Sequence, residues 1–128
     1  MIKNILIIEN DEKLVEILKE FFSEYEYALK VLPQVYDIRP IVEEFKADLV
    51  LVDFLLPGLN GGELCLQIKR SEKLKNIPVI IYSAFPKVML SLEDYGCNAF
   101  VSKPFDLQKL MEQIKACINE PDRSYLLL

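Results

Sequence analysis

The chain has 128 residues, with 15 basic and 20 acidic side chains, a formal net charge of −5 and no histidine. A chain of this length buries roughly two-thirds of its unfolded surface, and a hydrophobic content of 52% suits one filled core. The negative charge argues against nucleic-acid binding through a general basic field, and the lack of histidine excludes His-ligated metal sites, histidine general bases and phosphohistidine on this chain.

Other absences narrow the class of protein further. No apolar run approaches the ~20 residues that a membrane span requires, and residues 1–4 lack the apolar segment of a signal peptide. The three cysteines, Cys65, Cys97 and Cys117, form no C-x-x-C pair, which is typical of reduced thiols in a cytoplasm. No glycine-rich nucleotide-binding motif is present. We therefore expect one cytoplasmic domain that does not contact a membrane.

Short apolar runs alternate with amphipathic segments along the chain. The runs bounded by polar or turn residues predict strands at residues 5–8, 27–32, 48–53, 77–82 and 98–101, of which 27–32 is weaker and nearer an edge. The 3.6-residue spacing of apolar side chains predicts helices at residues 14–25, 38–46, 63–70, 86–95 and 106–119. Asp106 is a good N-cap for the last helix, and Gly96 is a natural end for the fourth.

Five strands that alternate with five helices predict an α/β fold with a parallel sheet, helices on both faces and right-handed crossovers. The doubly wound strand order 2-1-3-4-5 places strands one and three next to each other at the switch point. We see no internal repeat and no second domain. Residues 1–120 are therefore expected to form the domain, and residues 121–128 a tail or the first part of a linker.

Polar residues follow four of the predicted strands. Glu9 and Asn10 follow the first strand, Asp53 ends the third, Ser83 follows the fourth and Lys103 the fifth. In an open parallel sheet these ends share one edge, where ligands bind. Each residue taken alone could instead cap a turn or helix or lie in a solvated loop. Together they predict one site that contains carboxylate, amide, hydroxyl and ammonium groups.

These residues, in this order, resemble the receiver domains of two-component response regulators. The resemblance covers residues 5 to about 119 and rests on Ile7-Ile8-Glu9-Asn10-Asp11, Leu51-Val52-Asp53, Pro57-Gly58 with Asn60-Gly61, Ser83-Ala84 and Phe100-Val101-Ser102-Lys103-Pro104-Phe105. It implies the flavodoxin-like receiver fold and a signalling protein of a phosphorelay, which is not a turnover enzyme.

The resemblance also implies a chemistry. Asp53 would be the nucleophile that accepts a phosphoryl group from a sensor histidine kinase or phosphotransfer protein. Lys103 and a bound Mg²⁺ would neutralise the charge that develops. The metal ligands would be Glu9, Asn10, Asp53 and the backbone carbonyl of Leu55.

A conformational switch is implied in the same way. Ser83 and Ala84 would contact the phosphoryl group, and movement of Ser83 would let the Phe100 ring turn inward. Partners would read the change on the face formed by the fourth helix, fifth strand and fifth helix. Apolar residues of the fourth helix predict either a homodimer or partner patch beside that face, or scattered exposed side chains; they are Val88, Met89, Leu90 and Leu92.

Asn10 departs from the family pattern of two acidic residues after the first strand. Mg²⁺ prefers anionic oxygen ligands, so we expect weak metal binding that Glu9 or Asp11 partly offsets. The alternative is a pseudo-receiver, an interaction module with weak or no phosphorylation. Leu55 and Phe85 are apolar at positions that modulate loss of the phosphoryl group in the family, which predicts a long-lived acyl phosphate.

Two other classes fit the sequence poorly. A flavodoxin-like domain that binds FMN needs a hydroxyl- and glycine-rich loop after the first strand, and the acidic residues at 9–12 would repel a phosphate there. A hydrolase with an aspartyl nucleophile would carry that nucleophile near strand one with D-x-D spacing.

Overall fold

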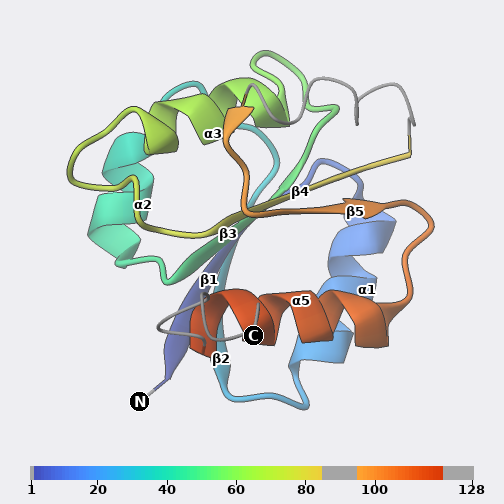
Figure 1. Ribbon diagram of the computed structural model, residues 1–128. Coiled ribbons are helices and arrows are strands. Elements are labelled where there is room, and N and C mark those ends of the chain that lie inside the picture. The colour runs from blue at the N-terminus through green and yellow to red at the C-terminus, as the bar shows by residue number, and fades with distance from the viewer. Residues whose placement is uncertain (1, 85–94, 120–128) are drawn as a thin grey trace, which may run out of the picture.

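The computed structural model describes residues 2–84 and 95–119 (Figure 1). The elements in chain order are β1 (Lys3–Ile8), α1 (Glu12–Phe22), β2 (Tyr27–Leu32), α2 (Arg39–Phe45), β3 (Leu49–Asp53), α3 (Gly61–Lys69), β4 (Val79–Ser83), β5 (Ala99–Ser102) and α5 (Leu107–Asn119). The five strands form one parallel sheet in the order β2-β1-β3-β4-β5. The predicted fold class and strand order are confirmed, with the weaker strand at an edge.

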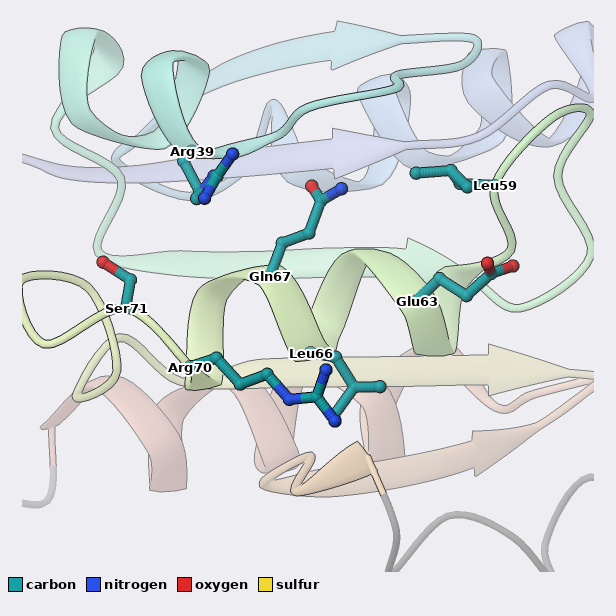
Figure 2. Close-up of a pocket in the computed structure, with 7 residues that line it drawn as sticks. All are labelled: Arg39, Leu59, Glu63, Leu66, Gln67, Arg70 and Ser71. Atoms are coloured by element: carbon teal, nitrogen blue, oxygen red, sulfur yellow. The ribbon is translucent and has the colours of Figure 1, made fainter.

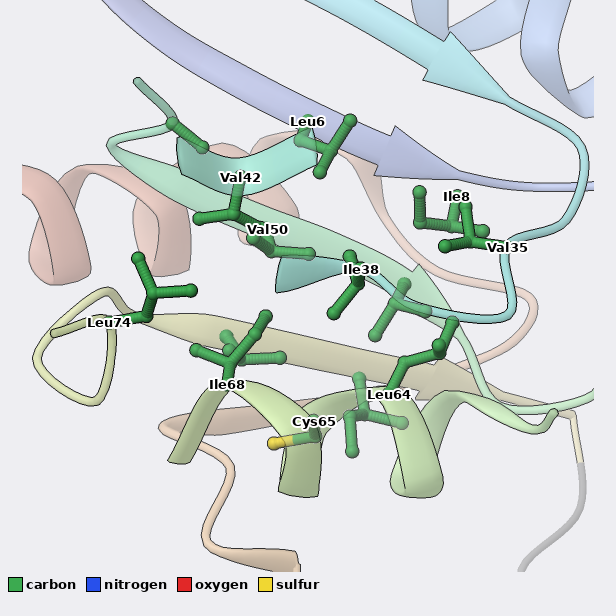
Figure 3. Packing of buried hydrophobic residues seen from close by; sticks show 14 of the residues in the cluster. Leu6, Ile8, Val35, Ile38, Val42, Val50, Leu64, Cys65, Ile68 and Leu74 are labelled. Carbon is green, nitrogen blue, oxygen red and sulfur yellow. The ribbon is translucent and has the colours of Figure 1, made fainter. Parts of the chain in front are cut away.

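Helices cover both faces of the sheet. Figure 1 shows α2 and α3 on one side and α1 and α5 on the other. Successive side chains of β1 point to opposite faces of the sheet. Leu6 and Ile8 pack on the side of α2 and α3, whereas Ile5 and Ile7 pack on the side of α1 and α5. Figure 3 shows the first of these clusters, to which Val50 of β3 and Leu64 of α3 also belong. This two-sided burial explains the unbroken apolar runs of the inner strands.

Four of the five predicted helices lie in the described part of the chain. The predicted fourth helix at 86–95 lies outside it except for Tyr95, and so do Phe85, the apolar residues at 88–92 and the tail at 121–128. No helix within residues 2–84 or 95–119 is long and apolar enough to cross a membrane.

The helices α1 and α5 each begin directly after an aspartate whose side chain caps the first turn. Asp11 accepts hydrogen bonds from Lys13 N and Leu14 N at the start of α1. Asp106 accepts them from Gln108 N and Lys109 N at the start of α5, which confirms its predicted capping role.

Strand ends differ slightly from the predicted ranges. β4 and β5 each extend one residue beyond the apolar run, because Ser83 pairs with Ser102 in the parallel ladder. β4 also begins two residues later than predicted, at Val79, whose amide donates to the side chain of Asn98. Hydrogen-bond pairing, and not hydropathy alone, therefore decides where these strands end.

Candidate functional site

Three charged side chains at or just after the ends of separate strands meet at the carboxyl edge of the sheet. The Nζ atom of Lys103 lies 3.1 Å from Oδ2 of Asp53 and 3.6 Å from Oε1 of Glu9. Both carboxylates are buried, with exposed fractions of 6% for Asp53 and 2% for Glu9. Two carboxylates and one ammonium give these three side chains a net negative charge. Burial of a charge that is not paired costs free energy, so one of the two carboxylates is only partly compensated.

The electrostatics of Asp53 reflect this imbalance. Burial raises the pKa of the Asp53 carboxyl above its ordinary value, and the neighbouring Glu9 carboxylate raises that pKa further. The Lys103 ammonium acts in the opposite direction, as does the hydrogen bond from Leu55 N to Oδ1 at 3.3 Å. An additional cation beside the two carboxylates would relieve their repulsion.

The predicted hydroxyl at the end of β4 is part of the same edge. Ser83 is buried, and its carbonyl oxygen accepts a hydrogen bond from Lys103 N at 2.8 Å. Ala84 is exposed and lines an apolar cavity of about 440 Å³ together with Lys103 and Phe105. Phe100 is half-buried in β5 and packs against the core cluster on the α2 and α3 side. The structure thus places Ser83 beside Lys103, and it places Phe100 on β5, the strand that neighbours β4.

The two carboxylates that meet at Lys103 are oxygen donors of the kind that a magnesium ion prefers. Within the described residues, no cluster of three or more His, Cys, Asp or Glu side chains could hold a metal ion. The set proposed from the sequence supplies two carboxylates, from Glu9 and Asp53, and two neutral oxygens, from Asn10 and the Leu55 carbonyl. Mg²⁺ binds oxygen ligands of both kinds, so the chemistry of this donor set is compatible with the ion, with fewer charges than three carboxylates would give.

Tyr82 is a site residue that the sequence reading missed, since it was interpreted only as part of a buried strand. Its hydroxyl donates a hydrogen bond of 2.6 Å to Oε1 of Glu9. Burial and the adjacent Glu9 carboxylate raise the pKa of the Tyr82 phenol, so the hydroxyl remains a neutral donor. A signal was available, because a tyrosine in the middle of a buried sheet needs a polar partner for its hydroxyl.

The turn after Asp53 brings α3 close to the phosphoacceptor candidate. An added Cβ on Gly61 would lie 2.4 Å from the carbonyl oxygen of Asp53, so only glycine fits there. Asn60 caps α3 and exchanges reciprocal hydrogen bonds with Glu63. The Asn60-Gly61 pair therefore allows the helix to begin directly against the backbone of the β3 end.

Residues 5–115 match the family model described as the response regulator receiver domain. The chain belongs to this family. Receiver domains act in phosphorylation-based two-component signalling and interact with histidine kinases or phosphotransfer proteins. They are signalling proteins and not turnover enzymes, in agreement with the resemblance seen in the sequence.

Curated relatives support the assignment of this receiver domain. The chain is 32% identical over 124 residues to the transcriptional regulatory protein YvcP of Bacillus subtilis, covering 94% of this chain and 51% of that protein. It is 28% identical over 124 residues to the response regulator DivK of Brucella ovis, covering 94% of this chain and 99% of that protein. The chain spans about half the length of the first curated relatives it matches.

Solved structures share the same fold. A CheY-like receiver domain protein from Methanospirillum hungatei superposes with a TM-score of 0.82 at 21% identity, covering 94% of this chain and 96% of that chain. The receiver domain of the sensor histidine kinase PA1611 from Pseudomonas aeruginosa superposes with a TM-score of 0.78 at 21% identity, covering 94% of this chain and 100% of that chain. That structure holds a magnesium ion coordinated in its active-site cleft.

A separate hollow of this receiver domain lies between α2 and α3, away from the strand-end site (Figure 2). Gln67 crosses it, accepting a hydrogen bond from Ile38 N and donating one to the carbonyl of Tyr36, each at 2.9 Å. Arg39 on its rim is paired with Asp37. These contacts tie the segment between β2 and α2 to α3, which is a structural role.

Proposed function

We propose that Asp53 accepts a phosphoryl group from the phosphohistidine of a sensor kinase or phosphotransfer protein. The contact that carries this proposal is the 3.1 Å ion pair between Lys103 and Asp53, buried at the carboxyl edge of the sheet beside Glu9. An Asp53 oxygen attacks phosphorus and forms the acyl phosphate. The phosphorus–nitrogen bond breaks, and its electron pair returns to the imidazole, which recovers a proton.

Residues of this chain prepare Asp53 for attack. The Lys103 ammonium favours the ionised carboxylate and then neutralises charge on the phosphoryl oxygens. Leu55 N and Lys103 Nζ bind different oxygens of Asp53, which fixes the plane of the carboxylate. Glu9, Asn10, Asp53 and the Leu55 carbonyl would hold Mg²⁺. When bound, the ion supplies positive charge at the transferring group.

The phosphodonor protein has an apolar surface to contact next to the site. Leu14 and Ile17 of α1 line one cavity with Phe105 and Leu107, and Lys103 lies at the same cavity. Ile17 is half-exposed, so it adds apolar surface at this cavity. An apolar helix face of the donor would cover this surface while its phosphohistidine reaches Asp53.

Phosphorylation would change the structure through the end of β4 and the neighbouring strand β5. Ser83 lies beside Lys103 and would bind a phosphoryl oxygen, with Ala84 next to it. Phe100 pairs with Ile81 across the β4–β5 ladder, so a shift of the β4 end bears on the position of its ring. We propose that the face formed by the predicted fourth helix, β5 and α5 is read by a partner, a homodimer through this face being one such readout. Residues 1–120 would form the switching domain.

One observation favours a second candidate, the pseudo-receiver. Asn10 is exposed and provides no charge where the family usually has an acid, so Mg²⁺ binding and phosphorylation would be weak. In that case the fold would act as a constitutive interaction module. The complete Asp53, Ser83 and Lys103 set favours the phosphorylated switch.

Intact-mass measurement after incubation with acetyl phosphate tests the proposal. We expect the protein to gain the mass of one phosphoryl group in the presence of Mg²⁺. When EDTA is added before the donor, we expect no gain. Asp53→Ala should abolish the gain, whereas the matched control Asp37→Ala, at an exposed carboxylate, should retain it. No gain at high Mg²⁺ concentration would favour the pseudo-receiver.

A further inference from the structure

Tyr82 occupies a central position between the groups of the proposed site. It pairs with Asp53 in the β3–β4 ladder, and its side chain is completely buried. We propose that Tyr82 is a positioning residue that holds the Glu9 carboxylate in the orientation needed to bind Mg²⁺ beside Asp53. This inference rests on the proposed function, because it concerns the metal that would assist phosphoryl transfer.

Glu9 is held at both carboxylate oxygens. Oε1 accepts a hydrogen bond of 2.6 Å from the Tyr82 hydroxyl, and Oε2 accepts one of 2.9 Å from Asp11 N. A glutamate side chain has three rotatable bonds, so without such contacts it would lose entropy each time it bound an ion. An ionised carboxylate has about four acceptor positions, so these two bonds leave positions for a cation.

The ring of Tyr82 contributes separately from its hydroxyl. The Lys103 ammonium lies 5.0 Å from the centre of the ring, a distance at which a cation is attracted to an aromatic face. The ring also packs edge-on against Phe105, with centroids 5.6 Å apart. Tyr82→Phe removes the hydrogen bond to Glu9 and keeps both ring contacts. That single change therefore isolates the positioning contact.

The neutral side chain of Asn10 makes the hydrogen bond between Tyr82 and Glu9 important. With a neutral side chain at position 10, Glu9 and Asp53 are the two carboxylates of the proposed ligand set. Groups that orient a metal ligand by hydrogen bonding commonly affect metal affinity by about 10- to 100-fold. The loss of a fixed Glu9 should therefore weaken Mg²⁺ binding at the lower end of that range.

The test is a calorimetric titration of the unphosphorylated protein with MgCl₂. We expect Tyr82→Phe to weaken Mg²⁺ binding about tenfold. The same substitution in a Glu9→Gln background should have no further effect, because Tyr82 acts through Glu9. Glu9→Asp keeps the charge but shortens the arm away from the Tyr82 hydroxyl, and should weaken binding to a similar degree. Tyr27→Phe, on the edge strand β2, is the matched control and should bind like the unchanged chain.

Three results would overturn the inference. They are unchanged Mg²⁺ affinity in Tyr82→Phe, an equal loss with Glu9→Gln already present, and no Mg²⁺ binding by the unchanged chain. If Tyr82→Phe does not fold, as judged by circular dichroism, Tyr82→Leu, which also removes the hydroxyl, is titrated with and without Glu9→Gln in its place and is judged by the same criteria. Mass measurement with acetyl phosphate separates this inference from the proposed function. A protein that shows the expected Mg²⁺ pattern but gains no phosphoryl group refutes phosphorylation and leaves the role of Tyr82 intact.

Discussion

The Nζ atom of Lys103 lies 3.1 Å from Oδ2 of Asp53, although the two residues are 50 positions apart in the sequence. The backbone of Lys103 is fixed by its hydrogen bond to the Ser83 carbonyl, which continues the β4–β5 ladder. The ammonium therefore reaches the end of β3 from two strands away. Its position depends on the register of the sheet and not on a local motif.

Replacing Lys103 should disable phosphoryl transfer without unfolding the domain. We expect Lys103→Met to slow phosphorylation by acetyl phosphate about 10²- to 10³-fold, the usual cost of removing one donor that stabilises developing charge. Intact mass as a function of time gives the rate. Lys109→Met, at an exposed position on α5, is the control and should leave the rate unchanged. A rate for Lys103→Met within threefold of the unchanged chain would contradict the role of Lys103.

Restoring an acid at position 10 should strengthen the metal site. Asn10→Asp adds a negative charge to the proposed ligand set, and we expect Mg²⁺ to bind about tenfold more tightly, which corresponds to about 1.4 kcal/mol. Calorimetric titration with MgCl₂ measures the change. Asn10→Ala removes the amide oxygen and should weaken binding. Equal affinities in all three proteins would show that position 10 does not contact the ion.

The acyl phosphate should be long-lived because Leu55 cannot orient water. The Leu55 side chain is half-exposed, while its amide is bound to Asp53. Leu55→Gln introduces a group that can hold an attacking water, and we expect loss of the phosphoryl group to accelerate about tenfold. The decay is followed by intact mass after the donor is removed. Leu55→Ala is the control, since it shortens the side chain without adding a polar group; equal acceleration in both variants would exclude the water-orienting explanation.

Gly61 should tolerate no side chain. A Cβ would meet the Asp53 carbonyl oxygen at 2.4 Å and the Phe54 Cα atom at 2.9 Å, and backbone atoms cannot move aside as a flexible side chain can. We expect Gly61→Ala to lower the free energy of unfolding by about 3 kcal/mol, measured by urea denaturation. Gly96→Ala is the comparison, because its φ of 72° imposes left-handed strain without a close contact, at a cost of about 1 kcal/mol. Gly61→Ala should therefore be the more damaging substitution.

Folding stability should fall in alkaline solution. Burial raises the pKa of the Cys65 thiol to about 12 and also raises the pKa values of Cys97, Tyr27 and Tyr82. The unfolded thiol loses its proton near pH 9 while the folded one keeps it, so rising pH favours unfolding. The lowered pKa of Lys69, also caused by burial, acts in the opposite direction.

The contribution of Cys65 to this decline can be measured separately. Between pH 9 and about 10.5 it should amount to roughly 2 kcal/mol of unfolding free energy, from about 1.4 kcal/mol per pH unit. Urea denaturation at several pH values tests this. Cys65→Ala should be less stable at pH 7, because it leaves a small cavity, but should decline less steeply above pH 9. A parallel decline in both proteins would show that the Cys65 thiol ionises equally in the two states.

Local sequence patterns determined the elements of this receiver domain. Apolar runs such as residues 49–52 predicted buried strands, because a strand covered on both faces must be apolar at consecutive positions. Asp53 at the end of such a run, and Lys103 after the fifth strand, predicted one shared site because parallel strands end on the same edge. The capping role of Asp106 followed from its short side chain alone.

Contacts between distant segments were decided by the tertiary structure alone. The hydrogen bond from Tyr82 to Glu9 joins residues on β4 and at the end of β1, and no local pattern specifies which buried polar group a tyrosine will meet. The Asn60-Gly61 turn was visible in the sequence, but the reason for glycine, a carbonyl oxygen in the way of any Cβ, was not. The sequence by itself determined which polar residues lie at the carboxyl ends of the strands. The packing and register of the sheet decided which of their atoms meet, because those distances depend on all the segments at once.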